Sequence, residues 1–330
     1  KLIEGMIEFG FEGRIYPINP SAREIMGLKA YPYIGDIEDR VDLAVISTPR
    51  EQVPGIVEEC ARRGIMGAII VPQGFADADK TGKDMQNQLT QIARQTGIRI
   101  LGPNTMGVIN AYSGFSTSFI YHKREKVPVG VICQSGIFFV GSAVFTGVMG
   151  KGIDIGNGCD LDFADALEYF GDDDDIEVIF VHIEGMSQGR RFFEIARRVA
   201  RRKPIIALKA ARSEEGAKAA LSHSGALVGR PEVFEAAFQQ AGITTALDSQ
   251  EVQDFTRAFL RLGPMEGNRI GVVSFTGAGG ILLIDTLEQN GLRLAELTLH
   301  TIERVQALSP SWMYIRNPLD IWPALMKHGI

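Results

Sequence analysis

Short apolar runs alternate along the chain with stretches in which apolar residues recur every three or four positions. The apolar runs have the continuity of strands buried on both faces, and the other stretches have the period of amphipathic helices. This alternation predicts an α/β protein made of tandem, three-layer, doubly wound domains. Strands are expected at residues 14–18, 42–47, 66–71, 127–133, 178–182, 205–209 and 269–274, and helices at 51–63, 84–96, 137–146, 189–202, 231–241 and 279–289.

Two polar breaks divide the 330 residues, at 121–126 and at 262–268. We therefore expect domains at 1–122, 123–262 and 263–330. The last is too short to enclose an α/β core, so it is expected to be the start of a longer domain. The chain opens in an expected helix at 1–9, whereas doubly wound folds begin with a strand and a glycine-rich turn. The first strand and that turn are therefore expected to be missing.

Composition narrows the function classes. The formal net charge of -6 offers no basic surface for nucleic acid or for an anionic membrane. Cys60, Cys133 and Cys159 lack the paired spacing of zinc or redox motifs, so reduced thiols and no metal site are expected. No run approaches the roughly 20 apolar residues of a membrane span. These features predict a cytoplasmic protein.

A candidate nucleophile lies in Ser222-His223-Ser224-Gly225. A neutral imidazole can attack an activated phosphoryl group, although a loop histidine on its own is more often a surface or capping residue. The phosphorylated ring would need donors for a dianion, and helix N-termini supply them. Two strand–turn–helix junctions are candidates for this role: Ser135-Gly136 and Gly279-Gly280.

Glu184 is the candidate carboxylate partner of the histidine. It follows a predicted strand, where ligands gather in such sheets, and it could accept the imidazole N–H and fix its tautomer. His182, within that strand, is expected to be a packed residue and not a second catalyst. The four consecutive acids at 172–175 are expected to form a solvated loop, because their side chains point in different directions.

Together these motifs resemble a known family. Residues 209–243, with Glu184 and the two glycine-rich helix starts, are similar to the phosphohistidine region of NDP-forming acyl-CoA synthetases, typified by ADP-forming acetyl-CoA synthetase and more distantly by succinyl-CoA synthetase. The resemblance implies that His223 is phosphorylated, that Glu184 supports it, and that both helix starts bind phosphate. Residues 153–157 and 317–320 match further landmarks of the family.

The first domain resembles the Rossmann-like CoA-binding domain of that family, and the later domains its flavodoxin-like ones. The resemblance implies CoA contacts from residues that follow predicted strands, namely Asn19, Pro20, Pro49, Gln73, Gly74 and Asn104. Two departures stand out. Thr105 replaces a cysteine common in the family, and residues 137–139 are bulkier than the small residues usual there, which is expected to crowd the site or alter the choice of acyl group.

The implied activity interconverts acyl-CoA, phosphate and ADP with a carboxylic acid, CoA and ATP through an acyl phosphate and a phosphohistidine. ATP or ADP and Mg²⁺ would bind an ATP-grasp domain or subunit outside this chain, and an oligomer is expected. One alternative is a non-catalytic CoA-sensing module, such as the regulatory half of a protein acetyltransferase. An NAD-dependent dehydrogenase is disfavoured, because neither the dinucleotide fingerprint nor its ribose-binding acid is present.

Overall fold

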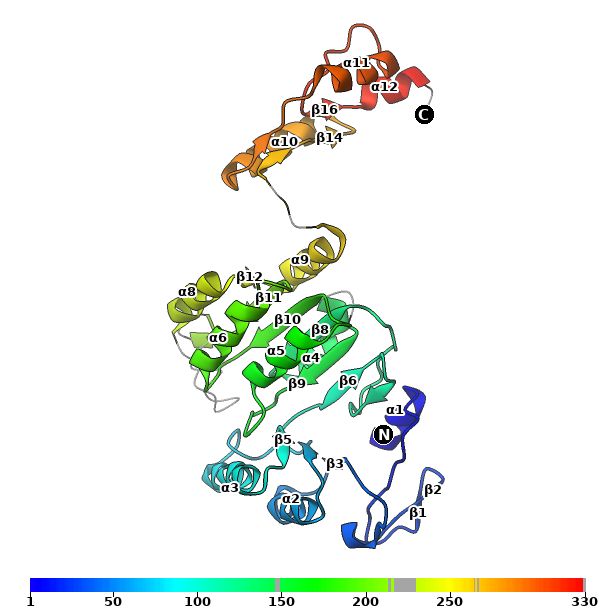
Figure 1. Ribbon diagram of the computed structural model, residues 1–330, viewed down its shortest axis with the longest axis vertical. Helices are drawn as coiled ribbons and strands as arrows, with labels where there is room; N and C mark the ends of the chain where they lie inside the picture. Colours follow the sequence, from blue (N-terminus) through cyan, green and yellow to red (C-terminus); the bar gives the residue numbers. More distant parts are fainter. Residues whose placement is uncertain (146–148, 213–214, 217–229, 264, 266, 329–330) are drawn as a thin grey trace. The chain divides into compact units, whose positions relative to one another are not determined.

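The computed structural model describes residues 1–145, 149–212, 215–216, 230–263, 265 and 267–328. The chain forms two compact units, residues 1–262 and residues 263–330 (Figure 1). Each unit is considered by itself below. No helix within the described ranges is long and apolar enough to cross a membrane.

The first part of the large unit contains a three-stranded parallel sheet in the order β3 (Leu43–Ile46), β4 (Gly67–Ile70), β5 (Arg99–Leu101). Helices α2 (Val53–Arg62) and α3 (Lys80–Thr96) pack on one of its faces. Ile69 and Leu101 turn to the other face and join the core of the following sheet, so the two sheets share apolar packing. The preceding elements are short: α1 (Leu2–Glu8), β1 (Glu24–Ile25), β2 (Leu28–Lys29), η1 (Ile34–Asp36) and η2 (Arg50–Gln52).

The strand expected at 14–18 does not form; that prediction was wrong. Only Ile18 bridges Tyr31, flanked by the hydrogen bonds Tyr31 N to Pro17 O (2.8 Å) and Asn19 N to Tyr31 O (2.9 Å). Pro17 has no N–H to donate, so a continuous ladder cannot extend through it.

A seven-stranded sheet forms the centre of the large unit, in the order β12-β11-β10-β8-β9-β6-β7. Strands β12 to β9 are parallel, and β6 and β7 add on antiparallel. Their bounds are β6 (Val108–Asn110), β7 (Phe115–Ser116), β8 (Val129–Cys133), β9 (Lys151–Asp154), β10 (Val178–Ile183), β11 (Ile205–Lys209) and β12 (Thr244–Ala246). This sheet therefore begins before residue 123, the boundary expected from the sequence.

Helices cover both faces of the sheet (Figure 1). Alternate residues of β10 point to opposite faces, so Ile179 and Val181 meet α5 (Phe163–Asp172), α6 (Gly189–Val199) and α8 (Pro231–Ala241). Val178 and Phe180 meet α4 (Gly136–Phe145) and α9 (Ser249–Arg261). All residues of β8, β10 and β11 are buried, as parallel strands between two helical layers should be.

The small unit pairs β13 (Arg269–Ile270) with β15 (Arg293–Leu294), and β14 (Val273–Ser274) with β16 (Leu319–Asp320). Its helices are α10 (Gly277–Gln289), α11 (Leu299–Leu308) and α12 (Trp322–His328). The single strand expected at 269–274 is thus split. The split falls at Val272, whose N–H donates to the side chain of Asn317 (2.9 Å).

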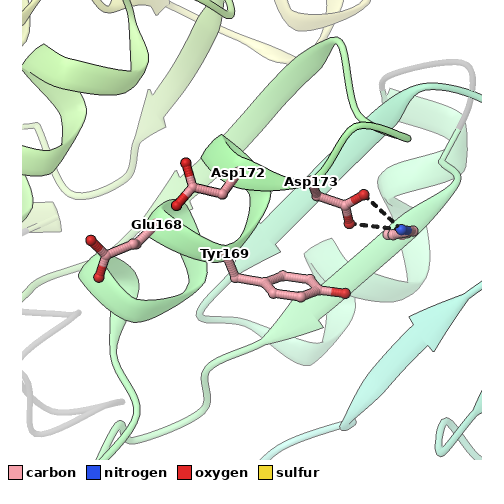
Figure 2. A pocket seen from close by; sticks show the side chains of 5 residues that line it. Glu168, Tyr169, Asp172 and Asp173 are labelled. Atoms are coloured by element: carbon pink, nitrogen blue, oxygen red, sulfur yellow. Dashed lines mark hydrogen bonds and ion pairs between the residues drawn. The ribbon is translucent and has the colours of Figure 1, made fainter.

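The acids at 172–175 were expected to be solvated, and this was wrong for Asp173. Lys151 Nζ, at the start of β9, lies 2.7 Å from a carboxylate oxygen of Asp173 and 2.6 Å from one of Asp175. The side chains of Lys151 and Asp173 are only 7% and 10% exposed. Figure 2 shows Asp173 directed into this contact, beside a hollow of about 380 Å³ also lined by Glu168, Tyr169 and Asp172. The contact ties the end of α5 to the sheet.

We predict that Lys151→Ala destabilises the protein by about 3 kcal/mol, because it leaves a buried carboxylate without its cation. Urea unfolding measures the change. Arg198→Ala is the matched control: Arg198 pairs with Glu168 on the surface, with the two side chains 54% and 43% exposed, and should cost at most about 1 kcal/mol. Adding Asp173→Asn to Lys151→Ala should recover part of the loss. Equal effects of the two single changes would contradict the burial argument.

Candidate functional site

The carboxyl ends of four neighbouring parallel strands bring polar residues to one edge of the seven-stranded sheet. Lys209 ends β11, Glu184 follows β10, Gln134 follows β8 and Asp154 ends β9, in the order in which these strands lie side by side. This edge is where ligands bind in doubly wound sheets.

Gln134 fixes the loop after β10 relative to the loop after β8. Its Oε1 accepts the backbone N–H groups of both Glu184 and Gly185, each at 3.0 Å. The following residues, Ser135 and Gly136, open α4, where the Phe139 N–H donates to the Ser135 carbonyl (2.9 Å). The first N–H groups of a helix have no acceptor within it. The backbone at Glu184 and the residue that precedes Ser135 are thereby held together.

Asp154 is a fully buried carboxylate at this edge. Its Oδ2 accepts the Met106 N–H (2.7 Å) and its Oδ1 the Gly156 N–H (3.4 Å). Burial raises the pKa of Asp154 to about 7, and the nearby Glu184 carboxylate acts in the same direction, while the two backbone donors oppose the shift. The Thr105 hydroxyl donates to the Asp154 carbonyl (2.5 Å) and accepts from the Gly107 N–H (2.9 Å). Thr105 therefore connects the loop after β5, in the three-stranded sheet, to the end of β9, in the seven-stranded sheet.

Lys209 ends β11 as a buried cation. Its Nζ donates to the carbonyls of Glu184 (2.7 Å) and Ala210 (2.5 Å) and lies 4.9 Å from the ring centroid of Phe234. Burial lowers the pKa of Lys209 to about 8, and Glu184 partly offsets this. Sequence reasoning assigned no role to Asp154 or Lys209. The available signal was a charged residue at the last position of an otherwise buried strand.

His182 is a packed residue, as expected. It is 1% exposed, and its ring stacks on that of Phe138 with centroids 3.9 Å apart and planes at 11°. Neither ring nitrogen has a hydrogen-bond partner within the part of the chain that the structure describes. Burial, helped by the nearby Lys209 cation, lowers the pKa of His182 to about 4, so the ring is neutral.

The expected CoA contacts fall in two places. Pro49, the pair Gln73-Gly74, and Asn104 follow β3, β4 and β5, so they share the carboxyl edge of the three-stranded sheet. Asn19 and Pro20 lie outside that sheet, in the segment that pairs with Tyr31, where Asn19 Oδ1 accepts the N–H groups of Ser21 and Ala22.

A hydrogen-bond network connects this edge to the loop after β9. Asp77 accepts the N–H groups of Gly74 and Phe75 (both 3.0 Å) and the side-chain amide of Asn157 (2.7 Å). A Cβ atom on Gly156 would lie 2.4 Å from the Pro103 carbonyl oxygen, so a glycine is required where the Gly102-Pro103-Asn104 loop crosses it. The candidate CoA edge and the candidate phosphate edge therefore meet at this crossing.

The small unit holds the other glycine-rich helix start. Gly279 and Gly280 lie in the first turn of α10, and a Cβ on Gly280 would stand 3.1 Å from Pro318. A pocket of about 440 Å³ opens there, lined by Ser274, Thr276, Gly277, Gly280, Ile281, Met313, Tyr314, Arg316, Pro318, Asp320 and Pro323. Asn317 supports it by donating to the carbonyls of Ile270 and Ala295, each at 2.8 Å.

His223, with Ser222, Ser224 and Gly225, lies outside the described residues. The described ranges contain no group of three or more His, Cys, Asp or Glu residues that could hold a metal ion.

Two family models match the chain: "CoA binding domain" over residues 2–111 and "Succinyl-CoA ligase like flavodoxin domain" over residues 126–259. The chain is 38% identical to acetate–CoA ligase [ADP-forming] II subunit alpha of Pyrococcus furiosus, over 94% of this chain and 68% of that one. It is 37% identical to acetate–CoA ligase [ADP-forming] II of Archaeoglobus fulgidus, over 97% of this chain and 48% of that one.

Among solved structures, the chain is similar to a dinucleotide-forming acetyl-coenzyme A synthetase 1 from Ca. Korarchaeum cryptofilum in complex with phosphate and ADP. The TM-score is 0.91 at 35% identity, covering 97% of this chain and 70% of that one. The chain thus spans about half of the Archaeoglobus ligase and about two thirds of the Pyrococcus alpha subunit and the Korarchaeum chain.

Asp154 and His182 should give the protein opposing pH dependences of stability. The pKa of Asp154 is raised on folding, so its contribution is present below pH 3.8 and is lost as pH rises through about 7. The pKa of His182 is lowered, so its contribution is present above pH 6.5 and is lost as pH falls to about 4.

Between about pH 4 and pH 7, we therefore predict that the stability of Asp154→Asn rises with pH, because only the His182 contribution remains. The stability of His182→Phe should fall with pH over the same range, because only the Asp154 contribution remains. Urea midpoints measured at intervals across the window test both. Identical pH profiles for the two variants would contradict the prediction.

Proposed function

The chain belongs to the ADP-forming acyl-CoA ligase family, the NDP-forming acyl-CoA synthetases, and on that premise we propose that it is the CoA-binding and phosphohistidine-carrying part of such an enzyme. The complete enzyme would interconvert acyl-CoA, phosphate and ADP with a carboxylic acid, CoA and ATP. The observation that carries the proposal is the contact of Gln134, shortly before α4, with the backbone N–H groups of Glu184 and Gly185, because it joins the loop after β10 to the start of α4.

The chemistry follows from these groups. Phosphate at Ser135-Gly136 would be stabilised by the helix N-terminus, and one of its oxygens would attack the thioester carbonyl. A C–O bond forms, the C–S bond breaks, and CoA leaves with its sulfur protonated. The imidazole of His223 then attacks the phosphorus of the acyl phosphate, the P–O bond to the acyl group breaks, and the carboxylate departs.

Glu184 would accept the remaining N–H of the ring and stabilise its positive charge. Gly279 and Gly280, in the first turn of α10, are also proposed to bind phosphate. ADP and Mg²⁺ would be held by an ATP-grasp domain or a partner subunit, to which the phosphoryl group passes. The Pyrococcus relative carries the name subunit alpha, which supports a separate partner.

CoA is proposed to bind the carboxyl edge of β3, β4 and β5 through Pro49, Gln73, Gly74 and Asn104, with Asn19 and Pro20 as outer contacts. The match to the CoA binding domain supports this. The network from Asp77 to Asn157 connects this edge to the loop after β9, so the thiol end of CoA can approach the phosphate edge. We propose three domains, an oligomeric assembly and a cytoplasmic location for the enzyme.

The alternative of a non-catalytic CoA-sensing module is not supported, because relatives that are 37% and 38% identical to the chain are ligases.

We predict that His223→Ala, in the complete enzyme, abolishes phosphorylation by ATP or by acyl-CoA plus phosphate, because the nucleophile is removed. Glu184→Gln should slow phosphorylation by roughly 10²-fold, the usual loss of a proton-transfer or orienting partner. Mass spectrometry at neutral pH detects the acid-labile phosphohistidine. His300→Ala, in the exposed face of α11, is the control and should behave as the unmodified enzyme. Unchanged ATP formation by His223→Ala would overturn the mechanism.

CoA should bind the complete enzyme and NAD should not, as calorimetry can measure. Gln73→Ala, at an exposed position after β4, should weaken CoA about 5-fold, the equivalent of one hydrogen bond of about 1 kcal/mol. Gln95→Ala, exposed near the end of α3, is the matched control and should leave the affinity unchanged. Tighter binding of NAD than of CoA would contradict the assignment.

A further inference from the structure

Phe138 occupies the third position of α4, beside the N–H groups assigned to phosphate. Side chains on a helix lean toward its N-terminus, so a residue at this position reaches back over the first turn. Its ring is half-buried, unlike that of Phe139, which is fully buried in the core below. Phe138 therefore lies between the start of the helix and the end of β10.

His182 fixes the position of that ring. It is buried at the next-to-last position of β10, on the face of the sheet that α4 covers, because alternate residues of a strand share a face and Val178 and Phe180 meet α4. With a centroid separation of 3.9 Å and planes at 11°, the two rings form one flat stack. Because its nitrogens have no partner among the described residues, the imidazole packs as an aromatic surface. The stack leaves Phe138 little freedom to swing aside.

Met106 also contacts the start of the helix. A Cβ atom on Gly136 would lie 2.9 Å from Met106 Cγ, so the thioether chain runs against the first residue of α4. The start of the helix is thus bordered by two apolar side chains, one of them rigid. Lys209 is a nearby cation, and its Nζ donates to the Glu184 and Ala210 carbonyls.

In an acyl phosphate, the acyl carbonyl is joined to the phosphate through a single oxygen, so the acyl chain must begin directly beside the bound phosphate. We propose that Phe138, held by its stack on His182, is the residue that selects the acyl group by size. The inference rests on the proposed function, because it requires phosphate at the start of α4. Apolar neighbours favour an uncharged chain, and the fixed ring excludes long ones.

The test is the rate of acyl phosphate formation by the complete enzyme from acetyl-CoA, butyryl-CoA or hexanoyl-CoA with phosphate, trapped as the hydroxamate. Phe138→Ala should raise the ratio of kcat/KM for hexanoyl-CoA to that for acetyl-CoA by about 10-fold or more, the usual effect of pocket size on one or a few methylenes. Phe138→Trp should shift the ratio the opposite way. Opposite shifts cannot come from a general loss of stability.

Three further variants separate selection from folding. His182→Phe keeps a ring under Phe138 and should retain the unmodified profile, whereas His182→Ala should broaden it. Phe139→Leu, in the adjacent fully buried ring, should lower stability and leave the profile unchanged.

If the unmodified enzyme forms acyl phosphate and the Phe138 variants have the same ratios of kcat/KM for the three thioesters as the unmodified enzyme, this inference fails and the proposed function stands. If the unmodified enzyme forms no acyl phosphate from any of these thioesters, the proposed function fails, and this inference fails with it.

Discussion

The site depends on one constraint: polar groups at the ends of fully buried strands must find partners without water. Strands β8, β10 and β11 are buried along their whole length, so their last residues bring backbone groups into an apolar surround. Side chains satisfy them. Gln134 accepts two N–H groups after β10, and Lys209 donates to two carbonyls. The same contacts that satisfy the backbone hold Glu184 beside the start of α4.

The buried charges at this edge show a second effect of burial. Desolvation raises the pKa of Asp154 and lowers that of Lys209. The pKa values of the two groups therefore lie closer together than those of a free carboxyl group and a free amine. Within the described ranges, each is held by backbone groups and neither forms an ion pair. Both groups therefore have pKa values near neutral pH, about 7 for Asp154 and about 8 for Lys209.

Several elements of both sheets could be predicted from the sequence, because β4, β10 and β11 are continuous apolar runs. Helix α8 was predictable because it begins at Pro231 and ends before Gly242, which has a positive φ. Strand β9 escaped prediction because it begins with Lys151 and ends with Asp154, both buried through specific partners that only the tertiary structure supplies. Similarly, Ser135-Gly136 and Glu184 could each be singled out from the sequence, but the bridging role of Gln134 required knowing that β8 and β10 are neighbours.

The crossing of residues 102–107 over the loop after β9 bears on modularity. Residues 102–107 lie within the part of the chain that matches the CoA-binding domain. However, the Thr105 hydroxyl and the Met106 N–H donate to Asp154. The side-chain amide of Asn157 in turn donates to Asp77. Recombining the two regions between unrelated relatives at the polar break near residue 122 would separate each of these pairs. A chimera should therefore take residues 102–107 and residues 154–157 from the same parent. The two segments are energetically coupled through their contacts, although they are about fifty positions apart in the sequence.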